Sequence, residues 1–337
     1  MSRATLLGLT FVGVGALIST AFLRIKQKVD QHPSTSVPWS EAPDYADFSS
    51  FPPTAPRDLV FLHHSVGQQW LADRGPEEPS GNRHPNGGGL RQMLKQGGYR
   101  VNEATYGSQL GEHTDLFDWL PKFNGHLDEV LRIGLQDERL PEGERNHIVL
   151  FKSCFPNSAF VSEGNEPGQT NGPDLTVSNA KATFGALLSV FERYPRTLFV
   201  FVTTPPLAPA VRDERLAKIL LNRVLHRETA SQQLVRQAEL ARQFRDWLIS
   251  PTGWLAGYLL PNVVVFDYYG ILTNHGTSPF LAYPSGRGDD SHPSAEGNRL
   301  ASTAFLPFLN RVVHRIEVAH EHTLSTSEKV ISPNPAP

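Results

Sequence analysis

The chain has 337 residues, of which 39% are hydrophobic and 19% charged, a composition typical of a folded globular protein and too apolar for a disordered one. Its net charge of −3 gives no electrostatic reason to expect binding to nucleic acid. Because Cys154 is the only cysteine, an intramolecular disulfide and a zinc ribbon are excluded, and no histidine spacing predicts a metal site or another cofactor.

The N-terminal segment, residues 1–26, contains a long apolar run. Ala4–Leu23 carries no charge over 20 residues, and a helix of that length spans about 30 Å, enough to cross a bilayer core. We therefore expect an uncleaved membrane anchor, with a signal peptide cleaved near Ala21 as the alternative. The basic residues after the run favour a cytoplasmic domain. A short N-terminal anchor followed by an enzyme more often faces outward, so we expect an extracytoplasmic domain, secreted if the segment is cleaved.

The composition divides the rest of the chain into three parts. Six prolines with intervening serines and acidic residues interrupt residues 27–57, which predicts an extended linker. The far end, residues 317–337, is polar and closes on Ser-Pro-Asn-Pro-Ala-Pro, which predicts a disordered tail. Residues 58–316 then form a single domain.

This domain alternates short apolar runs with helical stretches. The apolar runs, which predict strands, are Asp58–Leu62, Arg100–Ala104, His147–Lys152, Thr197–Thr204 and Asn262–Asp267. The helical stretches are Leu90–Gln96, Leu127–Leu135, Ser178–Tyr194, Gln233–Ile249 and Ala295–Ile316. The alternation predicts a three-layer αβα sandwich around a doubly wound, five-stranded parallel sheet of order 2-1-3-4-5.

The sheet order predicts where a ligand binds. In an open parallel sheet the site lies beyond the carboxyl ends of the strands, where the strand order reverses, here between the first and third strands. Ser65 follows the first strand, in a turn with Gly67, and is either a nucleophile or a helix N-cap. Asn157 follows the third strand, after Cys154, which we interpret as a buried structural thiol rather than a nucleophile.

A second group of polar residues precedes the last helix. Asp289 and His292 lie three residues apart in a loop rich in glycine, serine and proline. A serine hydroxyl becomes a nucleophile when a base removes its proton, and the base needs a carboxylate to fix its tautomer. Helix capping by Ser294 explains part of this loop but gives no role to His292.

Together these residues resemble the SGNH (GDSL-like) hydrolases: a serine after the first strand, an asparagine after the third, and Asp-x-x-His before the C-terminal helix. The resemblance covers about residues 58–313. It implies that Ser65 attacks an ester carbonyl, that His292 is the general base and then the acid, and that Asp289 orients His292. It also implies an oxyanion hole made by the Ser65 N–H, the Asn157 amide, and the N–H of Gly107, with Gly111 as the fallback.

Three departures from the family pattern matter. His63-His64 stands where the family has Gly-Asp, and we expect one of these side chains to pack and the other to line the site, because neighbouring residues at a strand end point to opposite sides. Asp290 competes with Asp289 as the orienting carboxylate, although the three-residue spacing favours Asp289. The third block lacks the usual Gly-x-x-Asp lead, so Ser158 or Ser153 competes with Asn157 as the polar group that points inward.

These residues predict a serine hydrolase that cleaves an ester through a Ser-His-Asp triad and an acyl-enzyme, without a cofactor. We expect a deacetylase or acyl-esterase acting on a small molecule, a carbohydrate or another polar substrate. The alternative is a membrane-tethered, non-catalytic binding module on a degenerate fold of the same kind. The altered residues before Ser65 favour the binding module, whereas the Asp-x-x-His pattern favours the enzyme, since a binding module needs no base.

Overall fold

Five short runs of apolar residues form the central sheet. The computed structural model describes residues 45–75, 87–210, 227–286 and 288–331. The strands are β1 (Arg57–Leu62), β2 (Tyr99–Ala104), β3 (Ile148–Phe151), β4 (Leu198–Val202) and β5 (Val263–Phe266). They pair in parallel in the order β2-β1-β3-β4-β5, which confirms the predicted sheet.

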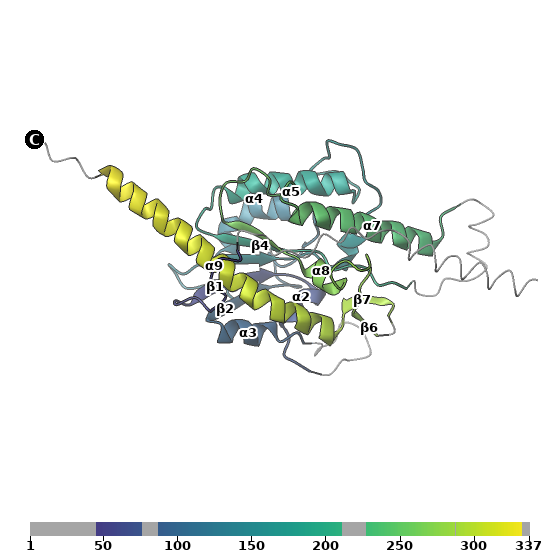
Figure 1. Ribbon diagram of the computed structural model, residues 1–337, viewed down its shortest axis with the longest axis horizontal. Coiled ribbons are helices and arrows are strands. Elements are labelled where there is room, and N and C mark those ends of the chain that lie inside the picture. The colour runs from purple at the N-terminus through teal and green to yellow at the C-terminus, as the bar shows by residue number, and fades with distance from the viewer. Residues whose placement is uncertain (1–44, 76–86, 211–226, 287, 332–337) are drawn as a thin grey trace, which may run out of the picture. The chain divides into compact units, whose positions relative to one another are not determined.

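Helices cover both faces of this sheet (Figure 1). One face carries α4 (Trp119–Val130), α5 (Val177–Phe191) and α7 (Ala230–Ile249). The other face carries α2 (Ser65–Leu71), α3 (Leu90–Gln96), α8 (Tyr268–Leu272) and α9 (Ala295–Ile331). Side chains alternate along β1, so that Val60 and Leu62 join the first core while Leu59 and Phe61 join the second. The predicted three-layer αβα sandwich is therefore confirmed.

Two predicted helices differ from the structure by more than a few residues. Helix α4 begins at Trp119, eight residues before the predicted start. Pro121 does not prevent this early start, because it lies in the first turn, where a missing N–H costs no helical hydrogen bond. Helix α9 continues to Ile331 instead of ending at Ile316. The prolines expected to prevent structure at this end lie only at 333, 335 and 337, so the helix covers much of the predicted tail, and residues 332–337 lie outside the described part.

The last part of the predicted linker packs on α9. The Tyr45 ring meets Phe308 edge-on at 5.9 Å between centroids, and Arg315 lies over the same ring at 5.1 Å. Asn310 Nδ2 donates to the Ser50 carbonyl at 2.7 Å. The chain before β1 is thus held on the domain from Tyr45 onward, where an extended linker was expected, because its ring and carbonyl find partners on the helix.

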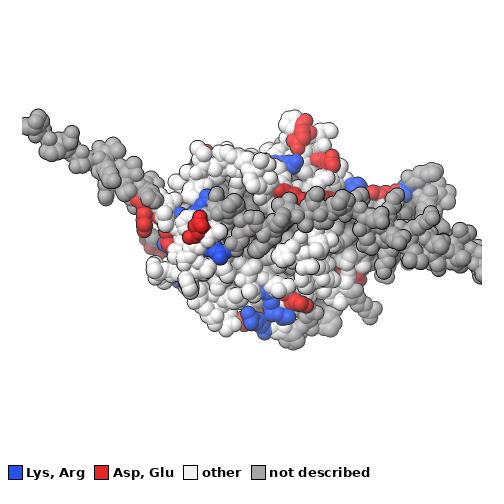
Figure 2. Space-filling view, in the orientation of Figure 1, with Lys and Arg blue, Asp and Glu red and all other residues white. Residues whose placement is uncertain are grey.

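The predicted membrane anchor, Ala4–Leu23, lies outside the described residues. Within the described residues, none of the helices is both long and apolar enough to span a bilayer. Figure 2 shows charged side chains of both signs dispersed among uncharged ones on the visible face.

A small hairpin precedes the last helix. Strands β6 (Pro284–Ser285) and β7 (Asp290–Pro293) pair antiparallel, where the sequence analysis expected a loop. Ser285 Oγ donates to the Pro293 carbonyl at 3.1 Å, which fastens the two strands beside the first turn of α9. This hairpin matters because it carries His292.

Candidate active site

Ser65 and His292 form a hydrogen-bonded pair. Ser65 is the first residue of α2, three residues after β1 ends, and its Oγ lies 3.0 Å from Nε2 of His292. The N-cap of α2 is His64, which makes no side-chain capping bond, so Ser65 does not have the capping role that was its alternative interpretation. Two residues separated by 227 positions therefore meet at the carboxyl edge of the sheet, as predicted from the strand order.

The carboxylate beside His292 belongs to Asp290 rather than to the predicted Asp289. Asp290 Oδ1 lies 2.7 Å from Nδ1 of His292 and also accepts the His292 backbone N–H at 3.0 Å. The reason is that the segment is a strand. In an extended chain residues two apart share a face, so Asp290 and His292 point the same way, whereas the spacing of three that favoured Asp289 suits a helical turn.

The imidazole of His292 is held in one orientation. It is 6% exposed, and the Phe155 ring packs edge-on against it at 4.9 Å between centroids. When Nδ1 carries the proton and donates it to Asp290, Nε2 accepts the Ser65 hydroxyl. The arrangement therefore leaves the serine hydroxyl bonded to the nitrogen that could take its proton.

A buried lysine and a buried cysteine lie close to Ser65. Cys154 is buried, as expected of a structural thiol, yet its Sγ lies 3.7 Å from Ser65 Oγ. Lys152 Nζ donates to the Ser153 carbonyl at 3.0 Å and approaches Cys154 Sγ at 3.9 Å. Complete burial lowers the pKa of Lys152. Its burial could not be predicted from the sequence, because a lysine at the end of an apolar strand usually extends to solvent.

Asn157 is present at the same edge with a fixed amide. It lies in the short helix η1 (Phe155–Ser158), which follows β3, the neighbour of β1. Its Oδ1 accepts the Leu116 N–H at 2.8 Å, and its Nδ2 donates to Asp115 Oδ1 at 2.6 Å. Both contacts orient the amide and leave one Nδ2 hydrogen for a ligand. The side chain is nearly buried, unlike a flexible surface asparagine.

The two glycines proposed for the oxyanion hole have their N–H groups engaged within their own loop. Gly107, in the left-handed region at φ 84°, donates its N–H to Glu112 Oε1 at 2.7 Å. Gly111, the fallback, donates to Ser108 Oγ at 3.0 Å. This differs from the prediction for Gly107, because the loop after β2 folds back on itself and its own side chains take up the amides.

The two histidines before Ser65 have separate roles, as expected. His63 is fully buried and packs against Phe61, with its Nδ1 2.9 Å from the His64 carbonyl. His64 turns toward the loop after β2, where its Nε2 donates to the Gly111 carbonyl at 3.0 Å and its ring stacks on Tyr106 at 3.9 Å between centroids. Desolvation lowers the pKa of His64.

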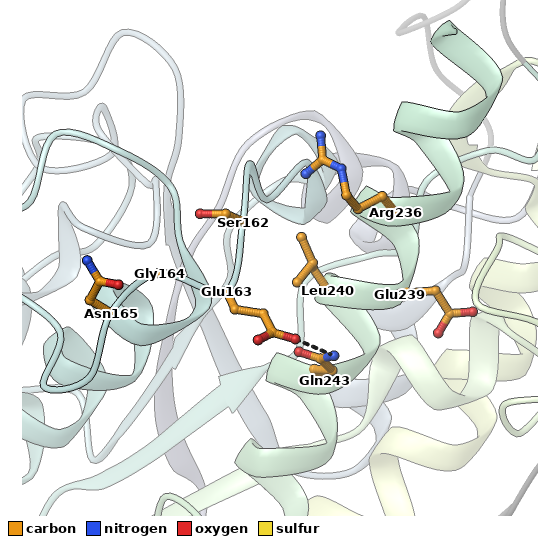
Figure 3. A pocket seen from close by; sticks show the side chains of 8 residues that line it. All are labelled: Ser162, Glu163, Gly164, Asn165, Arg236, Glu239, Leu240 and Gln243. Carbon is orange, nitrogen blue, oxygen red and sulfur yellow. Dashed lines mark hydrogen bonds between the residues drawn. The ribbon is translucent and has the colours of Figure 1, made fainter. Parts of the chain in front are cut away.

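A separate cavity lies along the loop that leaves η1. It has a volume of about 640 Å³ and is open to solvent between that loop and α7, and Figure 3 shows its lining. Glu163 and Gln243 face each other across it, with Gln243 Nε2 donating to Glu163 Oε1 at 3.3 Å. The other lining residues are Ser162, Gly164, Asn165, Arg236, Glu239 and Leu240. Most of the lining side chains are polar or charged, and they include neither Ser65 nor His292.

The part of the chain that the structure describes contains no group of three histidine, cysteine, aspartate or glutamate side chains placed to hold a metal ion. No family model and no curated protein sequence matches the chain.

Three solved structures illustrate what the chain is similar to. An acetyl xylan esterase from Geobacillus stearothermophilus is 12% identical, with a TM-score of 0.36 over 79% of this chain and 97% of that one. An alpha/beta hydrolase from the metagenome of Lake Arreo, Spain, is 13% identical, with a TM-score of 0.37 over 77% and 96%. A carbohydrate esterase family 2 enzyme with a carbohydrate-binding domain from Corynascus thermopiles is 14% identical, with a TM-score of 0.35 over 77% and 68%.

At these identities and scores the fold assignment rests on the chain's own features. The sheet order, the serine after β1 and the histidine before α9 are those that the resemblance to the SGNH hydrolases implied.

Proposed function

We propose that this protein is a serine hydrolase that cleaves carboxylic esters, with Ser65 as nucleophile, His292 as general base and acid, and Asp290 as the orienting carboxylate. The observation that supports the proposal is the continuous hydrogen-bonded chain from Ser65 Oγ through His292 to Asp290, with distances of 3.0 and 2.7 Å. A helix cap or a packing histidine has no need of this arrangement, whereas proton transfer from a serine requires it.

The reaction follows from these contacts. Ser65 Oγ attacks the carbonyl carbon of the ester while its proton moves to Nε2 of His292, and the Asp290 carboxylate stabilises the imidazolium that forms. The tetrahedral intermediate collapses when His292 returns the proton to the leaving alcohol, which leaves an acyl group on Ser65. Water then attacks this acyl-enzyme with His292 again as base, and the carboxylic acid is released.

The negative oxygen of the intermediate needs hydrogen-bond donors. The Ser65 N–H belongs to the first turn of α2, where backbone N–H groups have no partner within the helix. The remaining Nδ2 hydrogen of Asn157 is a second donor, and Asp115 and the Leu116 N–H hold that amide in place. A donor of this kind typically contributes a factor of about 10²–10³ to the rate.

We propose a polar alcohol part for the substrate, such as an acetylated or acylated carbohydrate. The support is the set of hydroxyl, amide and carboxylate side chains in the cavity of Figure 3, which lies along the loop that leaves η1 after Asn157. The binding-module alternative is not favoured, because a non-catalytic relative has no use for a base bonded to the serine.

The test is hydrolysis of p-nitrophenyl acetate and labelling by a fluorophosphonate, both with the purified full-length chain. We expect activity and labelling in the natural protein, loss of both in Ser65→Ala, and neither change in Ser189→Ala, which alters an exposed serine of α5. Acetate release from an acetylated xylo-oligosaccharide then tests the substrate class. Activity that survives Ser65→Ala contradicts the nucleophile, and a folded protein that is neither labelled nor active indicates the binding module.

A further inference from the structure

The loop after β2 does not offer the glycine N–H that was expected as the third donor of the oxyanion hole. The family resemblance implied a glycine N–H there, yet Gly107 donates to Glu112 and Gly111 donates to Ser108. Releasing either N–H would break a hydrogen bond of 2.7 or 3.0 Å within the loop. Another group of the same loop is better placed to act on an oxyanion.

Tyr106 is that group. It precedes Gly107, and its ring stacks on His64 at 3.9 Å between centroids with the planes 22° apart. His64 is itself anchored by its hydrogen bond to the Gly111 carbonyl, and it is the residue directly before Ser65. The ring of Tyr106 is therefore held beside the nucleophile by two contacts, although half of the side chain remains exposed.

The phenol of Tyr106 reaches the reacting atoms. Its oxygen lies near both the hydroxyl and the backbone N–H of Ser65, and both groups act as donors toward it. During attack, the carbonyl oxygen of the substrate must lie beside Ser65 Oγ and within hydrogen-bond distance of the Ser65 N–H. The phenol oxygen thus borders the volume in which negative charge develops, and rotation about its C–O bond directs the O–H toward that charge while the ring stays stacked on His64.

We infer that the Tyr106 hydroxyl donates a hydrogen bond to the oxyanion and takes the place of the glycine N–H. The inference rests on the proposed ester hydrolysis. No proton is transferred from Tyr106 in this contact. The Ser65 proton goes to His292, and the phenol O–H stabilises the oxygen that becomes negative by donating a hydrogen bond to it. Tyr106 would then be a catalytic residue, and His64 a positioning residue that holds its ring.

The electrostatic surroundings suit a donor. Desolvation raises the pKa of Tyr106, so the phenol keeps its proton at neutral pH. The pKa of His64 is lowered, chiefly by desolvation, so at neutral pH the stacked imidazole is uncharged and does not favour ionisation of the phenol. A neutral phenol can donate its hydrogen, whereas a phenolate would repel the oxyanion.

Tyr106→Phe tests the inference, since it removes only the hydroxyl and keeps the ring that stacks on His64. With p-nitrophenyl acetate we expect kcat to fall by about 100-fold while KM changes less than threefold. Affinity for phenylboronic acid, whose tetrahedral adduct with serine carries a negative oxygen, should fall with it. The matched control is Tyr258→Phe, which removes a phenol bonded to Asn262 outside the site and should change neither value.

The outcomes separate this inference from the proposed function. If the natural protein is active and requires Ser65, but Tyr106→Phe keeps more than half of kcat, the role of Tyr106 is wrong and the hydrolase assignment stands. If Tyr106→Phe raises kcat/KM, the phenol obstructs the oxyanion position and the inference is overturned. If the natural protein has no esterase activity, the proposed function fails first. Near-ultraviolet circular dichroism of each variant shows whether the fold is retained.

Discussion

Replacing Asp290 with asparagine tests whether the Asp290 carboxylate orients His292 through its charge or only packs against it. The variant keeps the size of the side chain and an oxygen for the His292 backbone N–H, but it removes the charge that faces Nδ1 at 2.7 Å. The two side chains are only 14% and 8% exposed, so solvent screens this contact weakly. Loss of a charge-assisted hydrogen bond is worth about 1.5–3 kcal/mol, which corresponds to a factor of about 10–100 in rate.

The asparagine has a second effect. Its NH₂ group can face Nδ1 and draw the ring proton to Nε2, where the imidazole no longer accepts the Ser65 hydroxyl. In a well-studied serine protease the equivalent change lowers kcat about 10⁴-fold. We therefore expect kcat for p-nitrophenyl acetate in Asp290→Asn to fall by about 10²–10⁴, with a thermal midpoint close to that of the natural protein.

Asp289→Asn is the matched control, because it makes the same chemical change one residue earlier, outside β7. Its kcat should stay within a few-fold of the natural value. An equal loss in both variants, or a loss in Asp289→Asn alone, would refute the argument from strand alternation. So would an Asp290→Asn protein that retains full activity.

The remaining predictions concern stability and location. Gly67→Ala should lower the free energy of unfolding by about 1–3 kcal/mol, because its Cβ would lie 2.4 Å from His63 Cβ. Gly185→Ala, in open space on α5, should raise it by up to about 1 kcal/mol. A urea midpoint that rises in Gly67→Ala contradicts the first prediction, and one that falls in Gly185→Ala contradicts the second. Desolvation lowers the pKa of Lys122 to about 8 in the folded protein. Between about pH 8 and about pH 10.4 the unfolded chain therefore binds more protons at this lysine than the folded protein does. In that range the unfolding free energy of the natural protein should rise with pH relative to that of Lys122→Met. A flat or falling difference in unfolding free energy contradicts this. The full-length chain should sediment with membranes and be released by detergent, whereas a chain that begins at Phe51 should stay in the supernatant. If the full-length chain is instead recovered in the supernatant without loss of mass, neither a membrane anchor nor a cleaved signal peptide is present.

The sheet and the order of its strands could be predicted because burial on both faces leaves a pattern in the sequence. Runs such as residues 148–151 and 198–202 are apolar without alternation, which only a strand covered on both sides requires. Once the strand order is known, the ends of β1 and β3 define the site, and Ser65 and Asn157 follow from their positions alone. His292 could be found because it returns to the same edge before the last helix.

The choice between Asp289 and Asp290 and the availability of the Gly107 N–H depend on local structure that the sequence does not display. Choosing between Asp289 and Asp290 requires knowing that their segment is extended, and the hairpin partner that makes it so is only two residues long. The availability of the Gly107 N–H depends on where Glu112 points, since that side chain takes up the amide. Both features depend on contacts within loops between residues that are several positions apart. No periodic pattern in the sequence predicts such contacts.

The site is thus held by two independent parts of the fold. The hydrogen-bonded chain from Ser65 through His292 to Asp290 joins the end of β1 to the hairpin before α9. The loop after β2 is fastened separately by Lys122, whose Nζ donates to the carbonyls of Leu110 and Glu112. Changes in the β2 loop should therefore lower kcat while the contact between His292 and Asp290 is kept, whereas changes at Asp290 act directly on the orientation of His292.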